Sequence, residues 1–322
     1  MSENIIGVPQ RRIDGGKKVS GQARYAADHP MGKMLYASGV YSTIANGRVV
    51  AIKDQQAKAM PGVVDIFHHD NFPSLHRTPN TKLSFAKMLS ASKADEHRLP
   101  FEDDRVYYPG QFVALVVAES FEQARAAAYR VTVEYDQRPA VKDLAEGMRV
   151  NGARDGGAGH NRGNPDSAFE GAKVKVDQTY TTPVEVHNPM EMHASTAWWQ
   201  DGKLFVYEST QGVVNHRNLL ANVFDLSPDQ VEVRAPFIGS GFGGKLWPWP
   251  HSVAACAAAQ SPGARCNWCC RVRRCSPPWA TVRKLASACV WPPMRAASWC
   301  RFVTSRSTTP RCSMTTPKTA AA

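Results

Sequence analysis

A continuous apolar run, Phe112 to Ala118, constrains the fold more than any other feature of the chain. A strand without alternating polar residues is expected where both of its faces are covered, so the chain must place other elements on each side of it. Ser120 follows as a helix N-cap, Glu122 to Tyr129 is predicted to be an alanine-rich helix, and Val131 to Tyr135 a further strand. The sequence therefore predicts a protein of mixed strands and helices around a buried sheet.

Short strands and helices are also predicted on both sides of this unit. Residues 68–104 form a polar stretch with three prolines, which indicates a long excursion between elements. The segment Asn151 to Asp166 is dense in Gly, Asn and Asp, a composition typical of a linker. Further strands are predicted at 34–41, 49–52, 63–67, 173–181, 194–200, 203–208 and 230–237, and further helices at 54–60 and 215–224.

Composition changes abruptly near residue 260. Residues 261–322 contain eleven Lys and Arg and no Asp or Glu, whereas residues 1–260 contain 28 basic and 28 acidic residues. The net charge of +11 therefore belongs to the tail, and the body gives no electrostatic reason to expect nucleic acid or a membrane as partner. The first residues lack the apolar core of a signal peptide, and no run of about 18 apolar residues occurs. We therefore expect a cytoplasmic chain.

The eight cysteines all lie at or after Cys256, which is not the pattern of a secreted disulfide-stabilised fold. The spacing C-x-x-C at Cys266 and Cys269, with Cys275 beyond it, nominally suits zinc or an iron–sulfur cluster. Arginines interleaved with tryptophans in the same region suit nucleic acid instead. A thiolate metal-binding function and a nucleic-acid-binding function of the tail are therefore two alternatives.

The stretch IGSGFGGKLWPWP, residues 238–250, satisfies two phosphate-loop patterns at once. Gly239, Gly241 and Gly244 form G-x-G-x-x-G, the dinucleotide pattern. Gly239 and Gly244 with Lys245 form G-x-x-x-x-G-K, the frame of a P-loop. Both patterns predict a loop whose backbone approaches a ligand closely.

The residues that follow fit neither phosphate loop. Leu246 stands where a P-loop needs Ser or Thr for its magnesium ion. Pro248 and Pro250 prevent the continuous helix whose N-terminus would face a pyrophosphate. Two interpretations are left: a tight structural turn, or a backbone ribbon that lies against a flat or anionic ligand.

Several motifs around this loop resemble one known family. VHNPMEMHAS (186–195), STQG (209–212) and RAPFIGSGFGGK (234–245) occur in this order. They resemble the molybdopterin-binding large subunit of the xanthine dehydrogenase/aldehyde oxidase family. Upstream, RIDGGKKVSGQARYAAD and QARAAAYRVTVEYD resemble the amino-terminal α/β-hammerhead domain of that family. The resemblance covers residues 11 to about 260.

The resemblance implies an α+β fold in which an α/β-hammerhead domain precedes the truncated start of a molybdopterin-binding α+β domain. A disordered tail is expected to follow. The predicted divisions are an N-terminal arm at 1–10, the hammerhead domain at 11–145, a linker at 146–170, the start of the molybdopterin-binding domain at 171–260, and the tail at 261–322.

The family's cofactor-binding residues match five positions of this sequence. In the family, the glutamine at the position of Gln211 hydrogen-bonds an oxo ligand of molybdenum. The segment matching Gly241, Phe242 and Gly243 lies beside the metal and the pterin, and Gly244 completes the predicted set. The resemblance therefore implies a molybdenum–molybdopterin cofactor. Without it, Gln211 is as readily explained as a cap of the next helix.

Two positions depart from the family pattern. Ser240 stands where glycine is usual, and Met192 stands where proline is usual. The neighbouring Glu191, in the segment P-M-E, is predicted to be structural. His187 and His193 flank it at a spacing compatible with zinc, although buried histidines without a metal are more common.

The resemblance implies oxidation or hydroxylation of an aldehyde or N-heterocycle with water as the oxygen source. Electrons would leave through an Fe–S subunit and an FAD-binding subunit, with no nucleic acid and no membrane as partner. The family's general-base glutamate lies near the carboxyl end of a much longer subunit. We therefore expect no catalytic residue and no metal ligand in this chain, and no activity. Because some members are exported with a partner, a periplasmic location is the alternative to a cytoplasmic one.

A change of reading frame explains the tail. One choice of codons for Cys275 to Trp291, shifted by one base, reads MFTTVGHRPETRQRVRL, which is similar to the family at this point. Residues from about Ser261 onward are therefore predicted to be translated out of frame. On this interpretation the excess of Cys, Trp, Arg and Pro implies no ligand.

Overall fold

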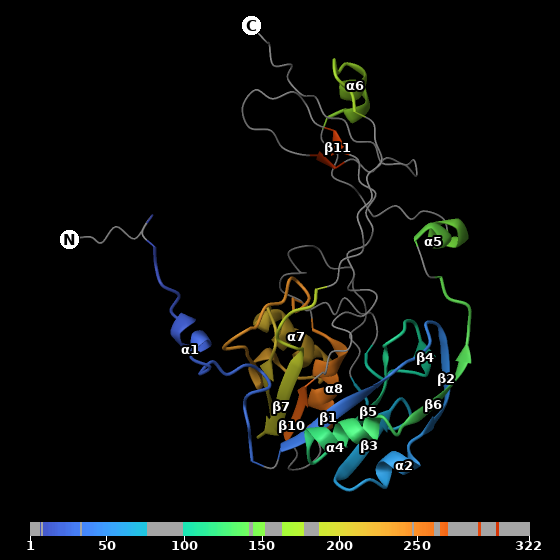
Figure 1. The fold of residues 1–322 in the computed structure, drawn as a ribbon, viewed down its shortest axis with the longest axis vertical. Helices are drawn as coiled ribbons and strands as arrows, with labels where there is room; N and C mark the ends of the chain where they lie inside the picture. The colour runs from blue at the N-terminus through green and yellow to red at the C-terminus, as the bar shows by residue number, and fades with distance from the viewer. Residues whose placement is uncertain are drawn as a thin grey trace, which may run out of the picture. The chain divides into compact units, whose positions relative to one another are not determined.

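A seven-stranded mixed sheet organises the part of the chain that contains the glycine loop (Figure 1). In the computed structural model the described residues are 7, 9–32, 34–75, 99–141, 144–151, 163–176, 187–246, 248–260, 265–269, 289–290 and 301–302. In sheet order the strands are β3 (Val63–His68), β5 (Phe112–Ala118), β1 (Met34–Tyr41), β10 (Arg265–Cys269), β7 (Ala194–Gln200), β8 (Lys203–Glu208) and β9 (Val231–Arg234). The pairs β1–β10 and β8–β9 are parallel, and the others are antiparallel.

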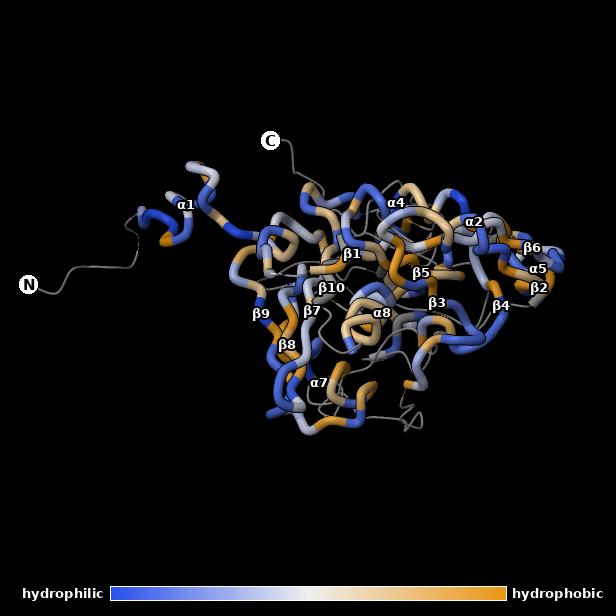
Figure 2. Tube along the Cα trace, turned by 90° about the horizontal axis from the view of Figure 1, so that it is seen from below, coloured by the Kyte–Doolittle hydropathy of each residue, from blue (hydrophilic) through white to orange (hydrophobic). Residues whose placement is uncertain are grey.

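Strand β5 is covered on both faces, as its apolar sequence predicts. Leu115 and Val117 join a core cluster that includes residues of helix α8 (Pro250–Ala258). Ala114 and Val116 join a second cluster, which includes Ala127 of helix α4 (Phe121–Ala128). Because alternate residues of a strand point to opposite faces, the two clusters lie on opposite sides of the sheet. Figure 2 colours β5 as hydrophobic, which is the composition expected of a strand buried on both faces.

The predicted strand–helix–strand unit forms, but its two strands enter different sheets. Ser120 caps α4 by accepting a hydrogen bond from the Gln123 backbone N–H at 3.2 Å. After α4 the chain forms β6 (Thr132–Gln137), which pairs with β2 in a separate antiparallel sheet. That sheet has the order β4 (Arg105–Val106), β2 (Gly47–Lys53) and β6.

The remaining helices of this unit are short or lie next to the glycine loop. They are α1 (Gly15–Val19), α2 (Gln55–Lys58) and α7 (Val213–Val223). A second unit comprises residues 140–186 and 281–322. Its described elements are α5 (Leu144–Asn151), α6 (Pro165–Glu170), and the antiparallel pair β11 (Cys289–Val290) and β12 (Arg301–Phe302).

Most predicted elements are confirmed, and one is not. The predictions at 34–41, 112–118, 194–200 and 203–208 match β1, β5, β7 and β8 at both ends. The strand predicted at 173–181 is wrong for residues 173–176, which lie outside any strand, and residues 177–181 lie outside the described residues. The predicted linker 146–170 contains α6, which begins with Pro165 after the N-cap Asn164. Residues 76–98 of the polar excursion also lie outside the described residues.

The structure differs from the predicted tail at residues 265–269. These residues form β10, which pairs with β1 on one side and β7 on the other. Sheet pairing uses backbone N–H and C=O groups, which every residue except proline supplies in full, so a composition unlike that of a strand does not prevent it. Strands from both predicted domains thereby share one sheet, with β10 between them.

Among the described residues, no helix has the length and apolarity that crossing a membrane requires.

A chain ended after Gln260 tests how much β10 stabilises the sheet. Removing β10 leaves β1 and β7 with unpaired backbone groups along facing edges, which favours aggregation. We expect a lower denaturant midpoint and a smaller monomer fraction than for a chain ended after residue 288, which keeps β10. Denaturant unfolding and light scattering measure both. Equal values for the two chains would show that β10 contributes nothing.

Candidate functional site

The glycine loop, Gly239–Gly244, lies between β9 and α8 and turns sharply. Its backbone takes positive φ at Ser240 (68°), Phe242 (50°) and Gly243 (89°). Phe242 and Gly243 are exposed, whereas Gly241 and Gly244 are buried. The loop therefore presents one flat aromatic ring and a bare stretch of backbone on its outer side.

Gly241 and Gly244 leave no room for a side chain. A Cβ at Gly241 would lie 2.4 Å from the Gln211 Oε1 atom, and a Cβ at Gly244 would lie 2.9 Å from the His187 Cγ atom. Real Cβ contacts are essentially never this short. Gln211 and Gly241, which are 30 positions apart in the sequence, are thus in direct contact. The predicted residues Gln211, Gly241 and Gly244 are brought together by this contact and by the turn itself.

Gln211 is held by the residue at the end of the loop. Its backbone N–H donates to the Lys245 carbonyl at 2.8 Å, and its side-chain Oε1 accepts from the Lys245 backbone N–H at 3.3 Å. Helix α7 has Gly212 as its N-cap and no side-chain cap. The interpretation of Gln211 as a helix cap is therefore wrong. The amide is instead oriented by Lys245, with the NH₂ group as the end that remains to donate.

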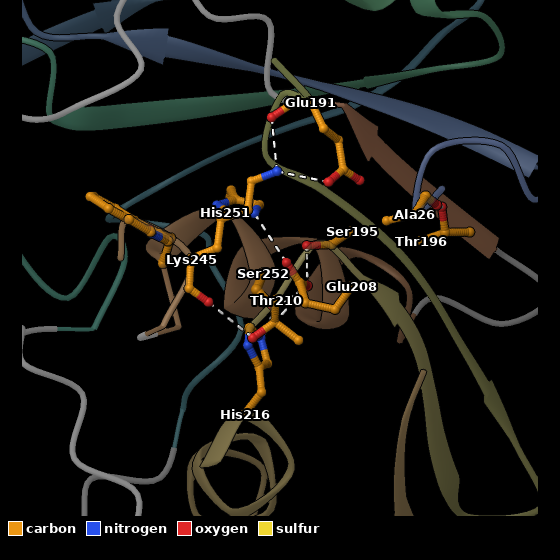
Figure 3. A network of polar contacts seen from close by, with 12 residues as sticks. Ala26, Glu191, Ser195, Thr196, Glu208, Thr210, His216, Lys245, His251 and Ser252 are labelled. Atoms are coloured by element: carbon orange, nitrogen blue, oxygen red, sulfur yellow. Dashed lines mark hydrogen bonds and ion pairs between the residues drawn. The ribbon is translucent and has the colours of Figure 1, made fainter. Parts of the chain in front are cut away.

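The lysine of the P-loop pattern points inward. The side chain of Lys245 is 0% exposed, and its Nζ donates to the Glu191 carbonyl and to Glu191 Oε2, both at 2.8 Å (Figure 3). Glu191 Oε2 also accepts from the Gly239 backbone N–H at 2.7 Å. Lys245 is thus committed to an internal ion pair and does not face an anion on the surface. Glu191 holds the loop at both of its ends, which supports the structural role predicted for it.

The unusual Ser240 has a local partner. Its φ of 68° lies in the left-handed region, which explains why glycine suits the position. The Ser240 hydroxyl accepts a hydrogen bond from the Met190 backbone N–H at 3.1 Å. The side chain therefore offsets part of the backbone strain and is turned toward the segment 187–193.

A buried polar network lies next to these segments and was not predicted from the sequence. Glu208, the last residue of β8, is 1% exposed. Its Oε2 accepts hydrogen bonds from Ser195 of β7 and Ser252 of α8. His216 of α7 and His251 of α8 are also buried beside it. The one sequence signal is an acidic residue that ends an apolar strand immediately before the motif STQG.

Burial dominates the titration of the histidine between the network and the loop. Desolvation, with a smaller contribution from the neighbouring His251 and Lys245 charges, lowers the pKa of His193 to about 3. Its ring lies 5.3 Å from the ring of Trp249, centroid to centroid. His193 is therefore neutral at physiological pH.

The ligand atoms of His187, Glu191 and His193 do not all lie within 4.8 Å of one another. Within the part of the chain that the structure describes, the one group of metal-ligating atoms within 4.8 Å of one another belongs to His68, His69 and Asp70, at the end of β3. Asp70 lies 3.3 Å from His68 and 3.4 Å from His69, and it is 71% exposed. Ordinary contacts between one carboxylate and two imidazoles account for that group.

Two family models match the chain. The aldehyde oxidase and xanthine dehydrogenase a/b hammerhead domain matches residues 20–139, and the molybdopterin cofactor-binding domain matches residues 151–274. The aldehyde oxidoreductase molybdenum-binding subunit PaoC of Escherichia coli K12 is 35% identical over 260 residues, which is 80% of this chain and 34% of that protein. The xanthine dehydrogenase molybdenum-binding subunit of Escherichia coli O157:H7 is 32% identical over 73% of this chain and 32% of its own length.

Solved structures show the same fold. Quinoline 2-oxidoreductase from Pseudomonas putida 86 has a TM-score of 0.67 and 23% identity, covering 82% of this chain and 34% of its own. CO dehydrogenase from Oligotropha carboxidovorans has a TM-score of 0.69 and 22% identity, covering 86% and 36%. The two family models together describe a hammerhead domain followed by a molybdopterin cofactor-binding domain. The chain belongs to the xanthine dehydrogenase/aldehyde oxidase family, and it spans about a third of the length of the relatives it matches.

Removing the buried ammonium tests how the loop is held. Lys245→Met leaves Glu191, which is 12% exposed, without its charge partner. We expect the free energy of unfolding to fall by about 3 kcal/mol, because a carboxylate left unpaired in the interior is costly. Denaturant unfolding measures the change.

The matched control is Lys53→Met, which breaks a lysine–glutamate pair with Glu134 at the surface, where the side chains are 59% and 48% exposed. Surface pairs contribute below about 1 kcal/mol. Equal losses in the two variants would contradict a structural role of the Lys245 ion pair.

The pKa of His193 predicts a pH dependence of stability. The unfolded chain binds a proton at His193 below pH 6.5, whereas the folded chain binds it only near pH 3. The unfolded state therefore carries the extra proton in this window, and the free energy of unfolding falls as the pH drops from 6.5 toward 3. One such site contributes a slope of up to about 1.4 kcal/mol per pH unit. His193→Gln is expected to reduce the slope measured by urea unfolding between pH 7 and 4.5, and an unchanged slope would contradict the assignment.

Proposed function

We propose that the chain is the amino-terminal part of a molybdenum hydroxylase large subunit and that Gln211 with Gly239–Gly244 forms one wall of its molybdenum–molybdopterin site. The observation that carries this proposal is the contact between Gly241 and the Gln211 amide. A single added methyl group at Gly241 would meet Gln211 Oε1 at 2.4 Å. The two segments that the family uses against its cofactor are therefore packed as one surface.

The residues present fit the cofactor. Because Gln211 Oε1 accepts from Lys245 N–H, the amide NH₂ group is the end that can donate to an oxo ligand. Gly243 is exposed and carries no side chain, so a flat pterin can approach its backbone. The ring of Phe242, 70% exposed, lies at the same surface. Gly244 shapes the turn against His187.

When bound, the molybdenum cofactor supplies the two-electron oxidation of an aldehyde or N-heterocycle, with water as the oxygen source. The chain's own residues bind and orient that group. Gln211 donates a hydrogen bond, the glycine loop permits close approach, and the Glu191–Lys245 pair keeps the loop in one conformation. Electrons would pass to an Fe–S subunit and an FAD-binding subunit. The name molybdenum-binding subunit, carried by PaoC, supports a division of labour between chains.

The chain by itself is proposed to be inactive. It spans about a third of its relatives, and by resemblance the general-base glutamate and the substrate pocket belong to the remainder of the subunit. The out-of-frame origin of residues from about Ser261 stays a prediction. Strand β10 lies beyond that boundary and the family match reaches residue 274, and the gene sequence locates the frame change. Nothing in the matches supports the thiolate-metal or nucleic-acid alternatives.

Sequencing the gene and restoring the frame tests the proposal. An inserted or deleted base is expected near the codons for Gln260 and Ser261. The frame-restored protein, expressed with its partner subunits in a host that makes the cofactor, should hold molybdenum in proportion to protein and oxidise aldehydes or N-heterocycles. The 322-residue chain should hold none. An intact frame would overturn the frameshift, and stoichiometric molybdenum with turnover in the short chain would overturn its inactivity.

Gly241→Ala in the frame-restored protein tests the site itself. The added Cβ displaces the Gln211 amide, so the molybdenum content is expected to fall at least tenfold. Gly16→Ala is the matched control, because a Cβ there meets nothing within 4 Å. Equal molybdenum contents in the two variants would contradict the placement of the cofactor.

A further inference from the structure

The carboxylate of Glu208 is enclosed by polar side chains from three other elements. Its Oε2 accepts from the Ser195 hydroxyl of β7 at 2.5 Å and from the Ser252 hydroxyl of α8 at 2.9 Å (Figure 3). The His251 Nε2 of α8 lies 3.4 Å from Oε1. The Nε2 of His216 in α7 lies 2.6 Å from Ser252 Oγ. All five side chains are at most 3% exposed.

The hydrogen-bond directions follow from the donors available. Ser252 gives its proton to Glu208, so its oxygen accepts from the Nε2–H of His216. Burial lowers the pKa of His216, although the Glu208 charge opposes the shift. Burial alone raises the pKa of Glu208, but His216, His251 and the Ser195 hydroxyl outweigh it and hold that pKa at about 2. The carboxylate is therefore ionised at physiological pH, beside the first turn of α8, whose backbone dipole favours a negative charge.

The network joins the two segments of the candidate cofactor site. Glu208 lies three residues before Gln211, and α7, which carries His216, starts two residues after Gln211. Helix α8, which carries His251 and Ser252, starts six residues after Gly244. The first segment is thus held at both ends by the network, and the second segment is held at its carboxyl end.

Hydrogen bonds continue from the network to the loop. Trp249, the N-cap residue of α8, donates from Nε1 to the Gly244 carbonyl at 2.5 Å. Between Glu208 and Gln211, the Thr210 hydroxyl donates to the Lys245 carbonyl at 3.2 Å. A displacement of α8 against β8 would therefore move the glycine loop relative to Gln211.

We propose that Glu208 is a positioning residue of the cofactor site, a buried anion that fixes the glycine loop Gly239–Gly244 against Gln211 by tying β8 to the start of α8. This inference rests on the proposed function, which assigns the glycine loop to the cofactor site. Its physical content, the coupling of one carboxylate to one loop, concerns the chain's own residues. A residue that only stabilised the fold would lower the free energy of unfolding without acting selectively on that loop.

Hydrogen exchange on the full 322-residue chain tests the proposal without any cofactor. Glu208→Gln keeps the shape of the side chain but removes its charge. It also replaces one accepting oxygen with an NH₂ donor, in a position surrounded by the donor groups of Ser195 and Ser252. Backbone amides of residues 239–246 are expected to exchange at least tenfold faster in this variant. Amides of β2 and β6, in the separate three-stranded sheet, should keep their rates.

Thr196→Val is the matched control. Thr196 is buried on the same strand as Ser195, but its hydroxyl donates to the Ala26 carbonyl and not to the network. Its replacement should destabilise the chain while leaving the relative exchange of residues 239–246 unchanged. Equal acceleration of the loop in both variants, or none in Glu208→Gln, would overturn the proposal.

A milder variant keeps the proposal testable if Glu208→Gln does not fold. Ser252→Ala removes only the hydroxyl between Glu208 and His216, and it should accelerate exchange of the loop in the same selective way. An unaffected loop in this variant would overturn the proposal as well. Loss of molybdenum binding in the frame-restored protein tests the proposed function separately, because the exchange measurement involves no cofactor.

Discussion

The burial of one ammonium group determines the shape of the candidate site. Lys245 is fully enclosed, so its charge must be met by internal acceptors, and the Glu191 carbonyl and carboxylate supply them. The same carboxylate accepts from Gly239 N–H, which ties the first residue of the glycine loop to the residue that follows its last glycine. The Lys245 backbone then orients Gln211 through its own N–H and C=O groups. The buried charge thus links both ends of the loop to each other and to Gln211.

Sharp turns and close contacts on the loop are consequences of this anchoring. With both ends fixed, the backbone passes through positive φ at three residues, two of which are not glycine. Such conformations cost about 1–2 kcal/mol for a residue with a side chain and persist where surrounding contacts enforce them. Ser240 recovers part of that cost through its hydrogen bond from Met190 N–H. The departure from the family pattern at this position is therefore compatible with the family's loop.

A continuous sheet positions the elements that carry the candidate site. One seven-stranded sheet contains strands of the hammerhead domain and strands of the molybdopterin-binding domain. Strand β10 lies between the two groups. Strand β10 has the Cys-rich sequence RCNWC, yet it pairs with β1 and β7 through backbone hydrogen bonds. Helix α8 packs on the same side as Leu115 and Val117 and delivers Ser252 and His251 to Glu208. The sheet, the helix and the buried anion together position the loop.

Local patterns in the sequence determined most strands, because burial on one or both faces leaves a trace in successive residues, as at 112–118 and 203–208. The residues Gln211, Gly241 and Gly244 followed from motifs in a fixed order. Only the tertiary structure decided that β5 and β6 enter different sheets, that Lys245 points inward, and that Glu208 is buried. The identity of a charged residue does not indicate which residue it will pair with. Backbone pairing such as that of β10 does not depend on its side chains, so their pattern does not predict it. These features depend on segments far apart in the chain, whose contacts exist only after folding.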